Sequence, residues 1–143
     1  MQSQRHIPEG AEIIGSGIGD GPGPQVMAAS SLDGTTAYSS DGQDVGKISE
    51  IMLDVPHGRI AYAVLTTGGF LGIGNRLHAI PWSALVMDTD EKCFRIAMTA
   101  ERIKTAPGFD KDNWPSMADP QWGVSVHEYY GREPYWGNRQ ETR

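Results

Sequence analysis

The stretch "VGKISEIMLDVPHGRIAYAVL", residues 45 to 65, decides the fold class because it predicts a β-hairpin. Its first half has a period of two, the spacing of one face of a strand, in the apolar residues Ile51, Leu53 and Val55. Ile48 has the opposite parity, so we expect this strand to bend or bulge near Ser49 and Glu50.

The second half of this stretch predicts a turn and a returning strand. Pro56 suits the second position of a turn, and Gly58 can adopt a positive φ. Residues 59–65 are then apolar on both parities, which is typical of a strand covered on two faces.

Further short strands are predicted at 77–82, 84–89 and 93–98. A helix of one or two turns follows, with Thr99 as its cap and Pro107-Gly108 as its stop. Short strands joined by tight turns, with helices only near the end, predict a small barrel or sandwich.

The two ends of the chain differ from this middle part. Residues 1–26 are rich in Gly and Pro and predict a flexible arm, in which the pair Ile13 and Ile14 could dock. We therefore divide the chain into this arm, a domain at 27–106 and an aromatic-rich extension at 107–143.

The extension predicts an amphipathic helix that starts at the N-cap Asp119 with Pro120 in its first position and stops at Gly131. Its predicted packed face holds four side chains: Trp122, Val126, Tyr129 and Tyr130. Docking on its own barrel is favoured over docking on a partner. His127 is expected on the surface.

The loop "GGFLGIG", residues 68–74, superficially resembles a phosphate-binding loop. Its glycine spacing is the reverse of the dinucleotide fingerprint, and the residues after it predict a strand where a phosphate site needs a helix. We therefore expect the apolar tip, Phe70, Leu71 and Ile73, to insert into the core, a second copy or a partner.

Residues 42–85 resemble the PRC-barrel family through Val45-Gly46-Lys47, the hairpin from Asp54 to Gly58-Arg59, and Ile80-Pro81-Trp82. The family is named from the cytoplasmic domain of the photosynthetic reaction centre H subunit, and a ribosome maturation factor carries a similar domain. The extension is similar to that of small stand-alone bacterial members, so the resemblance spans roughly residues 27–136. It implies a mostly β fold, a small partly open antiparallel β-barrel with short C-terminal helices packed on it. It also implies a protein-interaction role without a general catalytic residue set.

Charge and composition narrow the function classes. The net charge of -6 and the pI of about 5.1 disfavour binding to nucleic acid backbones. Cys93 is the single cysteine, which excludes an internal disulfide and favours a reducing compartment. With neither a signal peptide nor a spanning segment predicted, we expect a cytoplasmic protein and no membrane contact.

No residue constellation predicts catalysis or a metal site. The histidines are scattered, and Cys93 is expected to be a small buried hydrophobe instead of a thiolate paired with His78. Asp54 and Arg59 predict an ion pair that sets the hairpin register. Three acidic residues predict a solvated turn without calcium-loop spacing: Asp88, Asp90 and Glu91.

We therefore predict a non-enzymatic interaction module without cofactor or metal, self-associating as a homo-oligomer, whose protein partner the sequence does not name. Its predicted contact residues come from the loop and the extension: Phe70, Leu71, Ile73, Trp122, Tyr129, Tyr130 and Trp136. The alternative is a small-molecule binder or enzyme whose barrel mouth is lined by His78 and Trp82.

Overall fold

The computed structural model describes residues 10–15, 25–68 and 76–137. Seven strands form one sheet in the order β1-β6-β7-β2-β3-β4-β5. Their bounds are β1 Glu12–Ile14, β2 Thr36–Tyr38, β3 Asp44–Asp54, β4 Arg59–Thr67, β5 Arg76–Pro81, β6 Leu85–Asp88 and β7 Cys93–Ile96. Two α-helices follow, α1 Ala100–Lys104 and α2 Pro120–Tyr129, and short 3₁₀ turns occupy Ala29–Ser31 and Trp82–Ala84.

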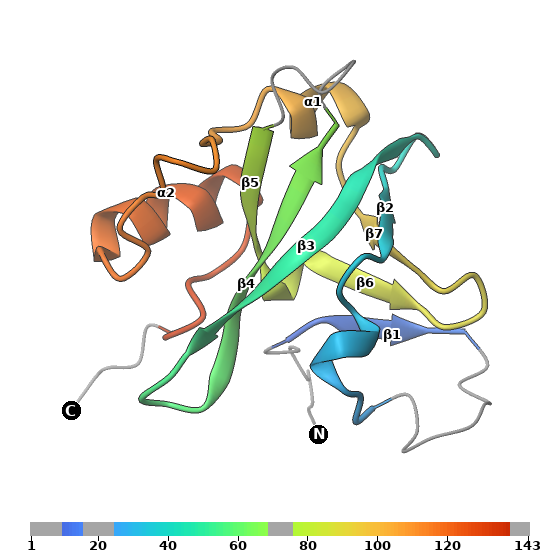
Figure 1. Cartoon of the computed structure of the whole chain (residues 1–143), viewed down its shortest axis with the longest axis horizontal. Helices are drawn as coiled ribbons and strands as arrows, with labels where there is room; N and C mark the ends of the chain where they lie inside the picture. Colours follow the sequence, from blue (N-terminus) through green and yellow to red (C-terminus); the bar gives the residue numbers. More distant parts are fainter. Residues whose placement is uncertain (1–9, 16–24, 69–75, 138–143) are drawn as a thin grey trace, which may run out of the picture.

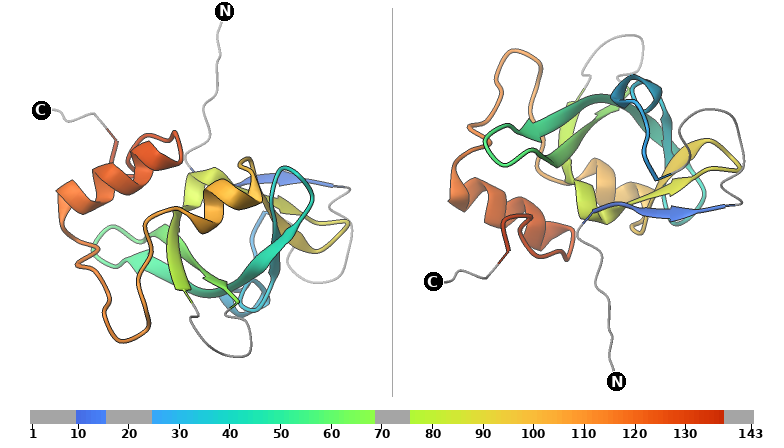
Figure 2. Two further views of the ribbon diagram at one scale, coloured as in Figure 1. Left: turned by 90° about the horizontal axis from the view of Figure 1, so that it is seen from above. Right: turned by 90° about the horizontal axis from the view of Figure 1, so that it is seen from below.

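The sheet curls into a barrel that stays open between its two edge strands, β1 and β5 (Figure 1). Figure 2 shows α1 in this gap and α2 outside the sheet, next to β5. The partly open, mostly β barrel with packed C-terminal helices is therefore confirmed. Two pairings differ from the antiparallel expectation, because β1 lies parallel to β6 and β2 parallel to β7.

The hairpin of β3 and β4 agrees with its prediction in the turn and the first bulge. The register shifts between Ile48 and Glu50, where the bulge is expected. The Gly58 N–H donates to the Asp54 carbonyl at 2.9 Å, and its φ of +64° is the left-handed value that the turn needs. The Arg59 Nε atom lies 2.9 Å from Asp54 Oδ2, which confirms the predicted ion pair.

A second register shift, between Met52 and Leu53, is absent from the sequence prediction. Its extra residue is Ala61 of β4, because Met52 pairs with Tyr62 and Leu53 with Ile60, so the alternation of β3 itself is unchanged. Ile51 packs against the main core, whereas Leu53 is 62% exposed and Val55 is 78% exposed. Leu53 and Val55 are exposed because they lie at the tip of the hairpin, outside both apolar clusters.

The main core lies inside the curled sheet, and α1 contributes Ala100 and Ile103 to it. Thr99 caps α1 as predicted, since its side-chain oxygen accepts the Arg102 N–H at 3.3 Å. Asp41 accepts the Ala100 N–H at 3.0 Å, which fixes the start of α1 against the β2–β3 turn.

β1 lies inside the segment predicted to be a flexible arm, and it holds the pair Ile13 and Ile14 against β6. The Ile14 carbonyl accepts the Thr89 N–H at 3.0 Å. Periodicity cannot predict a three-residue strand, because its place depends on a partner strand far along the chain.

Candidate functional site

A second apolar cluster covers the outer face of β4 and β5 and holds the C-terminal extension in place. Tyr62 lies at its centre, with its ring centroid 5.2 Å from that of Trp122, 5.4 Å from His127 and 5.6 Å from Tyr135. Asp119 caps α2 and Pro120 is its first residue, as predicted. Gly131 follows the helix with a φ of +69°, which turns the chain back across it.

The four aromatic residues predicted as contacts in the extension all have contacts within the chain. Trp122 packs on Tyr62, and Trp136 packs on His127 with ring centroids 5.7 Å apart. Tyr130 belongs to both apolar clusters. These contacts agree with the favoured expectation that α2 docks on its own barrel.

Cation–π contacts tie the extension to the rest of the chain at two points. The Arg102 guanidinium lies 4.4 Å from the Tyr129 ring centroid, and the Tyr129 hydroxyl donates to the Arg102 carbonyl at 2.8 Å, which joins α1 to α2. Arg59 lies 5.1 Å from the Tyr135 ring centroid and donates to the Tyr135 carbonyl at 3.2 Å. The extension is therefore part of the folded unit.

His127 is buried, with 1% of its surface exposed, so the prediction of a surface histidine is wrong. Tyr135 and Trp136 return over the helix and cover it. Its Nδ1 atom lies 2.7 Å from the Gly123 carbonyl, and because a carbonyl only accepts, Nδ1 carries the proton. Nε2 is then a buried acceptor, and it has no hydrogen-bond partner among the described residues.

Burial lowers the pKa of both His127 and His78, and a hydrogen bond to a carbonyl opposes the shift in each. A histidine whose folded-state pKa lies below its unfolded value of 6.5 binds fewer protons when folded. We therefore expect the free energy of unfolding to decrease as the pH falls below 6.5, until the folded-state pKa is passed.

This pH dependence can be measured by urea denaturation between pH 7.5 and 5 for the wild type and His127→Gln. The variant should show a shallower decrease than the wild type, because it lacks one of the two buried histidines. An unchanged slope in His127→Gln would contradict the lowered pKa.

His78 and Trp82, the lining of the alternative ligand site, both serve packing. His78 is fully buried, and its Nδ1 atom lies 3.3 Å from the Pro107 carbonyl. Trp82 packs on Phe94 at the main core with ring centroids 6.0 Å apart. Each side chain thus contributes to the barrel's own stability.

Cys93 is buried as predicted, and burial raises the pKa of its thiol, which disfavours the thiolate. Its strand β7 is separated from the His78 strand by β2, β3 and β4 in the sheet order, so the sheet does not place them on neighbouring strands.

Asp88 departs from the predicted solvated turn because its residue is only 7% exposed. Its carboxylate accepts the N–H groups of Asp90 and Glu91 at 3.0 Å each, and it pairs with Arg95 Nε at 2.9 Å. The Glu91 N–H and the Arg95 guanidinium hold the pKa of Asp88 below its usual range. Asp88 therefore organises the β6–β7 turn.

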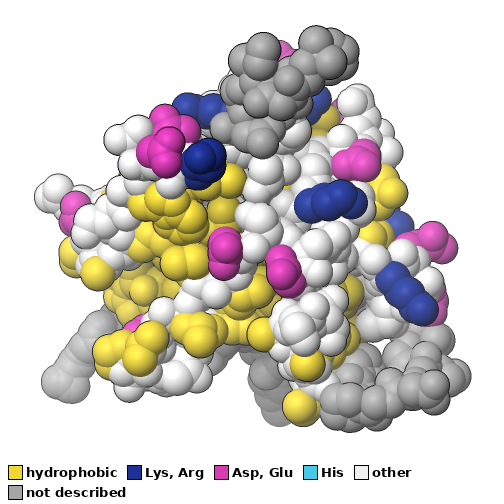
Figure 3. Space-filling model, viewed as in Figure 1, with side chains coloured by type: hydrophobic (Ala, Val, Ile, Leu, Met, Phe, Trp, Pro, Cys, Tyr) yellow, Lys and Arg dark blue, Asp and Glu magenta, His cyan; other side chains and the backbone are white. Residues whose placement is uncertain are grey.

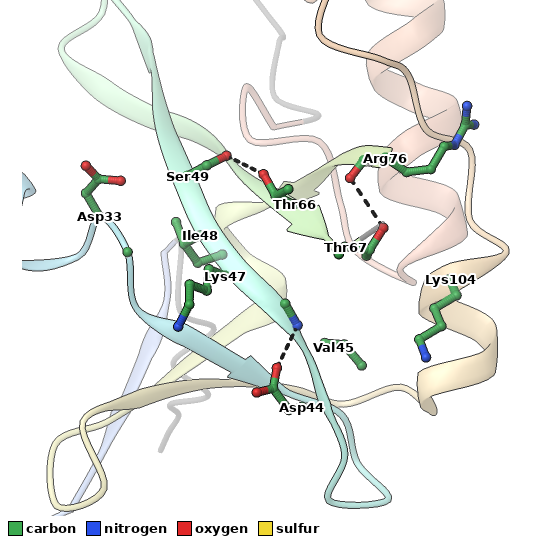
Figure 4. Close-up of a pocket in the computed structure, with 13 residues that line it drawn as sticks. Asp33, Asp44, Val45, Lys47, Ile48, Ser49, Thr66, Thr67, Arg76 and Lys104 are labelled. Carbon is green, nitrogen blue, oxygen red and sulfur yellow. Dashed lines mark hydrogen bonds between the residues drawn. The ribbon is translucent and has the colours of Figure 1, made fainter. Parts of the chain in front are cut away.

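A groove of about 880 Å³, lined by both polar and apolar residues, lies where β3 begins, β4 ends and β5 begins (Figure 4). In Figure 4, Arg76 and Lys104 lie at one side of it, and Lys47 and Asp33 lie toward the other. The sequence prediction missed this groove, because residues far apart in the chain, from three strands, α1 and the segment before β2, build it.

The apolar side chains on the surface form a second feature that the sequence prediction missed. Figure 3 shows hydrophobic side chains gathered over the β3–β4 hairpin and the part of the sheet beside α2. Leu53 and Val55 are its most exposed members on the hairpin. The predicted contacts Phe70, Leu71 and Ile73 lie outside the described residues.

Two searches of the described residues bear on function. No group of three or more His, Cys, Asp or Glu side chains within them is arranged to hold a metal ion. No helix among them has both the length and the apolar character needed to cross a membrane.

The family model for the PRC-barrel domain matches residues 24–103, which is more than half of the chain. The chain therefore belongs to the PRC-barrel family. Comparison with curated proteins gave no match.

One similar solved structure is the crystal structure described as a 16S ribosomal RNA processing protein, RimM, from Pseudomonas aeruginosa. The two chains are 16% identical with a TM-score of 0.38, and the match covers 52% of this chain and 45% of that one. The chain thus matches less than half of that protein's length.

Proposed function

We propose that the protein is a non-enzymatic interaction module that self-associates through the tip of the β3–β4 hairpin. One observation carries the proposal: Leu53 and Val55 are 62% and 78% exposed on the longest hairpin of the barrel. Complete burial of such a side chain is worth about 1.5–3 kcal/mol, so a second copy that covers both would gain a useful part of a dimer's stability.

Two further observations support an interaction role. PRC-barrel domains serve mainly as protein-interaction modules, and this chain is a member of the family. The side chains with catalytic potential are used structurally: His127 bonds to its own helix, His78 to Pro107, and Asp88 to Arg95 and its own turn.

The loop residues Phe70, Leu71 and Ile73 are a second proposed contact, on the grounds of their apolar character alone. Trp122, Tyr129, Tyr130 and Trp136 are half-buried against the barrel, so we propose them as a support for the hairpin surface and as secondary contacts.

Sedimentation velocity over a concentration series tests the self-association. The wild type should show a concentration-dependent stoichiometry, and Leu53→Asp/Val55→Asp should raise the dissociation constant about thirtyfold or more, because both apolar contacts are lost and charges are buried. Leu71→Asp tests the loop in the same way.

Val26→Asp is the matched control, since Val26 is also a strongly exposed apolar residue but lies outside the hairpin. Circular dichroism should show all variants folded. A wild type that stays monomeric at every concentration, or a hairpin variant that associates like Val26→Asp, would contradict the proposal.

A further inference from the structure

The chain that follows α2 folds back over one buried side chain of that helix. Residues 132–137, which we call the return segment, leave the end of α2 and run back toward the β3–β4 hairpin (Figure 1). The rings of Tyr135 and Trp136 lie on the His127 ring, with their centroids 5.8 Å and 5.7 Å from its centroid. His127 is 1% exposed, whereas the two rings that cover it are only partly buried. The return segment therefore separates this imidazole from water.

The two nitrogens of the His127 ring differ in their surroundings. Nδ1 carries a proton and donates it to the Gly123 carbonyl at 2.7 Å. Nε2 is an acceptor without a hydrogen-bond partner among the described residues. A second proton, on Nε2, would create a buried cation whose new N–H finds no acceptor in this part of the structure. The closed site therefore fits the neutral ring and not the charged one.

The titratable groups around the imidazole do not offset a positive charge on it. Tyr62 from β4 and Tyr135 from the return segment are in ring contact with His127, and burial raises the pKa of both phenols, so both stay neutral. Beyond Tyr135 lies the Arg59 guanidinium, 5.1 Å from that ring centroid and paired with Asp54. Burial is the main cause of the lowered pKa of His127, and a backbone carbonyl opposes it.

The return segment is the covering element that can move at the lowest cost in free energy. Tyr62 lies in β4, which is paired with a strand on each side, and α2 is a helix of ten residues. Two hydrogen bonds tie the return segment to the rest of the described chain, from the Arg132 N–H to the His127 carbonyl and from Arg59 to the Tyr135 carbonyl. Segments with few such bonds open locally at a lower free energy than the whole fold.

We propose that the return segment is an acid-released cover, which lifts from α2 when His127 becomes protonated and admits water to the ring. The open state can bind a proton at Nε2 that the closed state excludes, so a fall in pH favours opening. The effect begins below pH 6.5, the pKa of an exposed histidine, and it raises the ratio of open to closed chains at most about tenfold for each pH unit. This opening is a property of the single chain and does not depend on self-association through the hairpin.

Hydrogen exchange followed by NMR on the full chain tests this opening at single amides. Two N–H groups report on the return segment: that of Arg132, which donates to the His127 carbonyl, and that of Gly137, which donates to the Pro134 carbonyl. After correction for the intrinsic pH dependence of exchange, their protection factors should fall about threefold or more between pH 7.5 and 5.5. The ring signals of His127 should titrate over the same pH range, which links the opening to this group in the wild type itself.

Three variants separate His127 from other causes. His127→Phe keeps a ring beneath the return segment but binds no proton, so its protection factors should be equal at the two pH values. His78→Gln is the matched control, because His78 is also buried but bonds to the Pro107 carbonyl, and it should keep the wild-type pH dependence. Tyr62→Phe removes a hydroxyl that a rotated, charged ring could reach, and it too should keep that dependence.

Three results would overturn the inference. The first is a protection factor in the return segment that does not change between pH 7.5 and 5.5, because the closed site would then accommodate or exclude the charge without opening. The second is equal protection of these amides and the slowest amides of β3, since the return segment would then open only with the whole fold. The third is a pH dependence that His127→Phe retains or that His78→Gln removes.

Discussion

Gly46→Ala should lower the free energy of unfolding by about 4 kcal/mol, the largest effect we expect from a single methyl group in this chain. Gly46 has a φ of +136°, which side chains rarely adopt. The added Cβ would also lie 2.1 Å from the Thr66 carbonyl oxygen and 3.2 Å from the Thr67 Cα atom, and backbone atoms cannot swing away as a flexible side chain can. Relief therefore requires β3 and β4 to separate.

Gly34→Ala is the matched control for this prediction. Gly34 also has a positive φ, +84°, but a Cβ there would meet nothing within 4 Å. Gly34→Ala should lower the free energy of unfolding by only about 1 kcal/mol, which is the cost of placing a side chain in the left-handed conformation. Guanidinium denaturation followed by tryptophan fluorescence and by far-UV circular dichroism measures both variants. Equal losses in the two would mean that the close approach of β3 and β4 at Gly46 does not limit stability.

The parts of the fold that the sequence predicts correctly depend on chemistry within a few residues. Gly58 forms the hairpin turn, Thr99 and Asp119 cap their helices, and Gly131 ends α2, because the groups that these residues satisfy belong to the same turn of chain. The bulge after Ile48 is visible in the sequence because it changes the parity of the apolar residues.

The parts that sequence reasoning missed depend on contacts between distant segments. Leu53 is exposed because the hairpin extends past both apolar clusters, and no change of parity in the sequence marks where the core ends. His127 is buried because Tyr135 and Trp136 return over α2, which a helical face drawn from α2 alone cannot show. The groove has no signal in the sequence, because its lining comes from segments as far apart as Asp33, Thr66 and Lys104.

Two variants of Tyr62 test separately the packing of its ring in the second apolar cluster and the cost of burying its hydroxyl. Tyr62→Ala removes a ring that is 1% exposed and contacts Trp122, His127 and Tyr135, so we expect a loss of about 3–5 kcal/mol in the free energy of unfolding. The stability should fall first in α2, because these contacts hold α2 on β4 and β5. Hydrogen exchange should therefore show reduced protection of α2 amides before those of β3.

Tyr62→Phe is the matched variant, and it should act in the opposite direction. The Tyr62 hydroxyl is buried without a hydrogen-bond partner among the described residues, and burial raises its pKa, so it stays protonated as an unsatisfied donor. Removal of such a group relieves a desolvation cost of about 1–3 kcal/mol while keeping the ring. We expect Tyr62→Phe to be at least as stable as the wild type in the same denaturation experiment. A clear destabilisation by Tyr62→Phe would show that the hydroxyl is satisfied in solution, by a buried water bridging it to a neighbouring acceptor such as Nε2 of His127, which has no partner among the described residues.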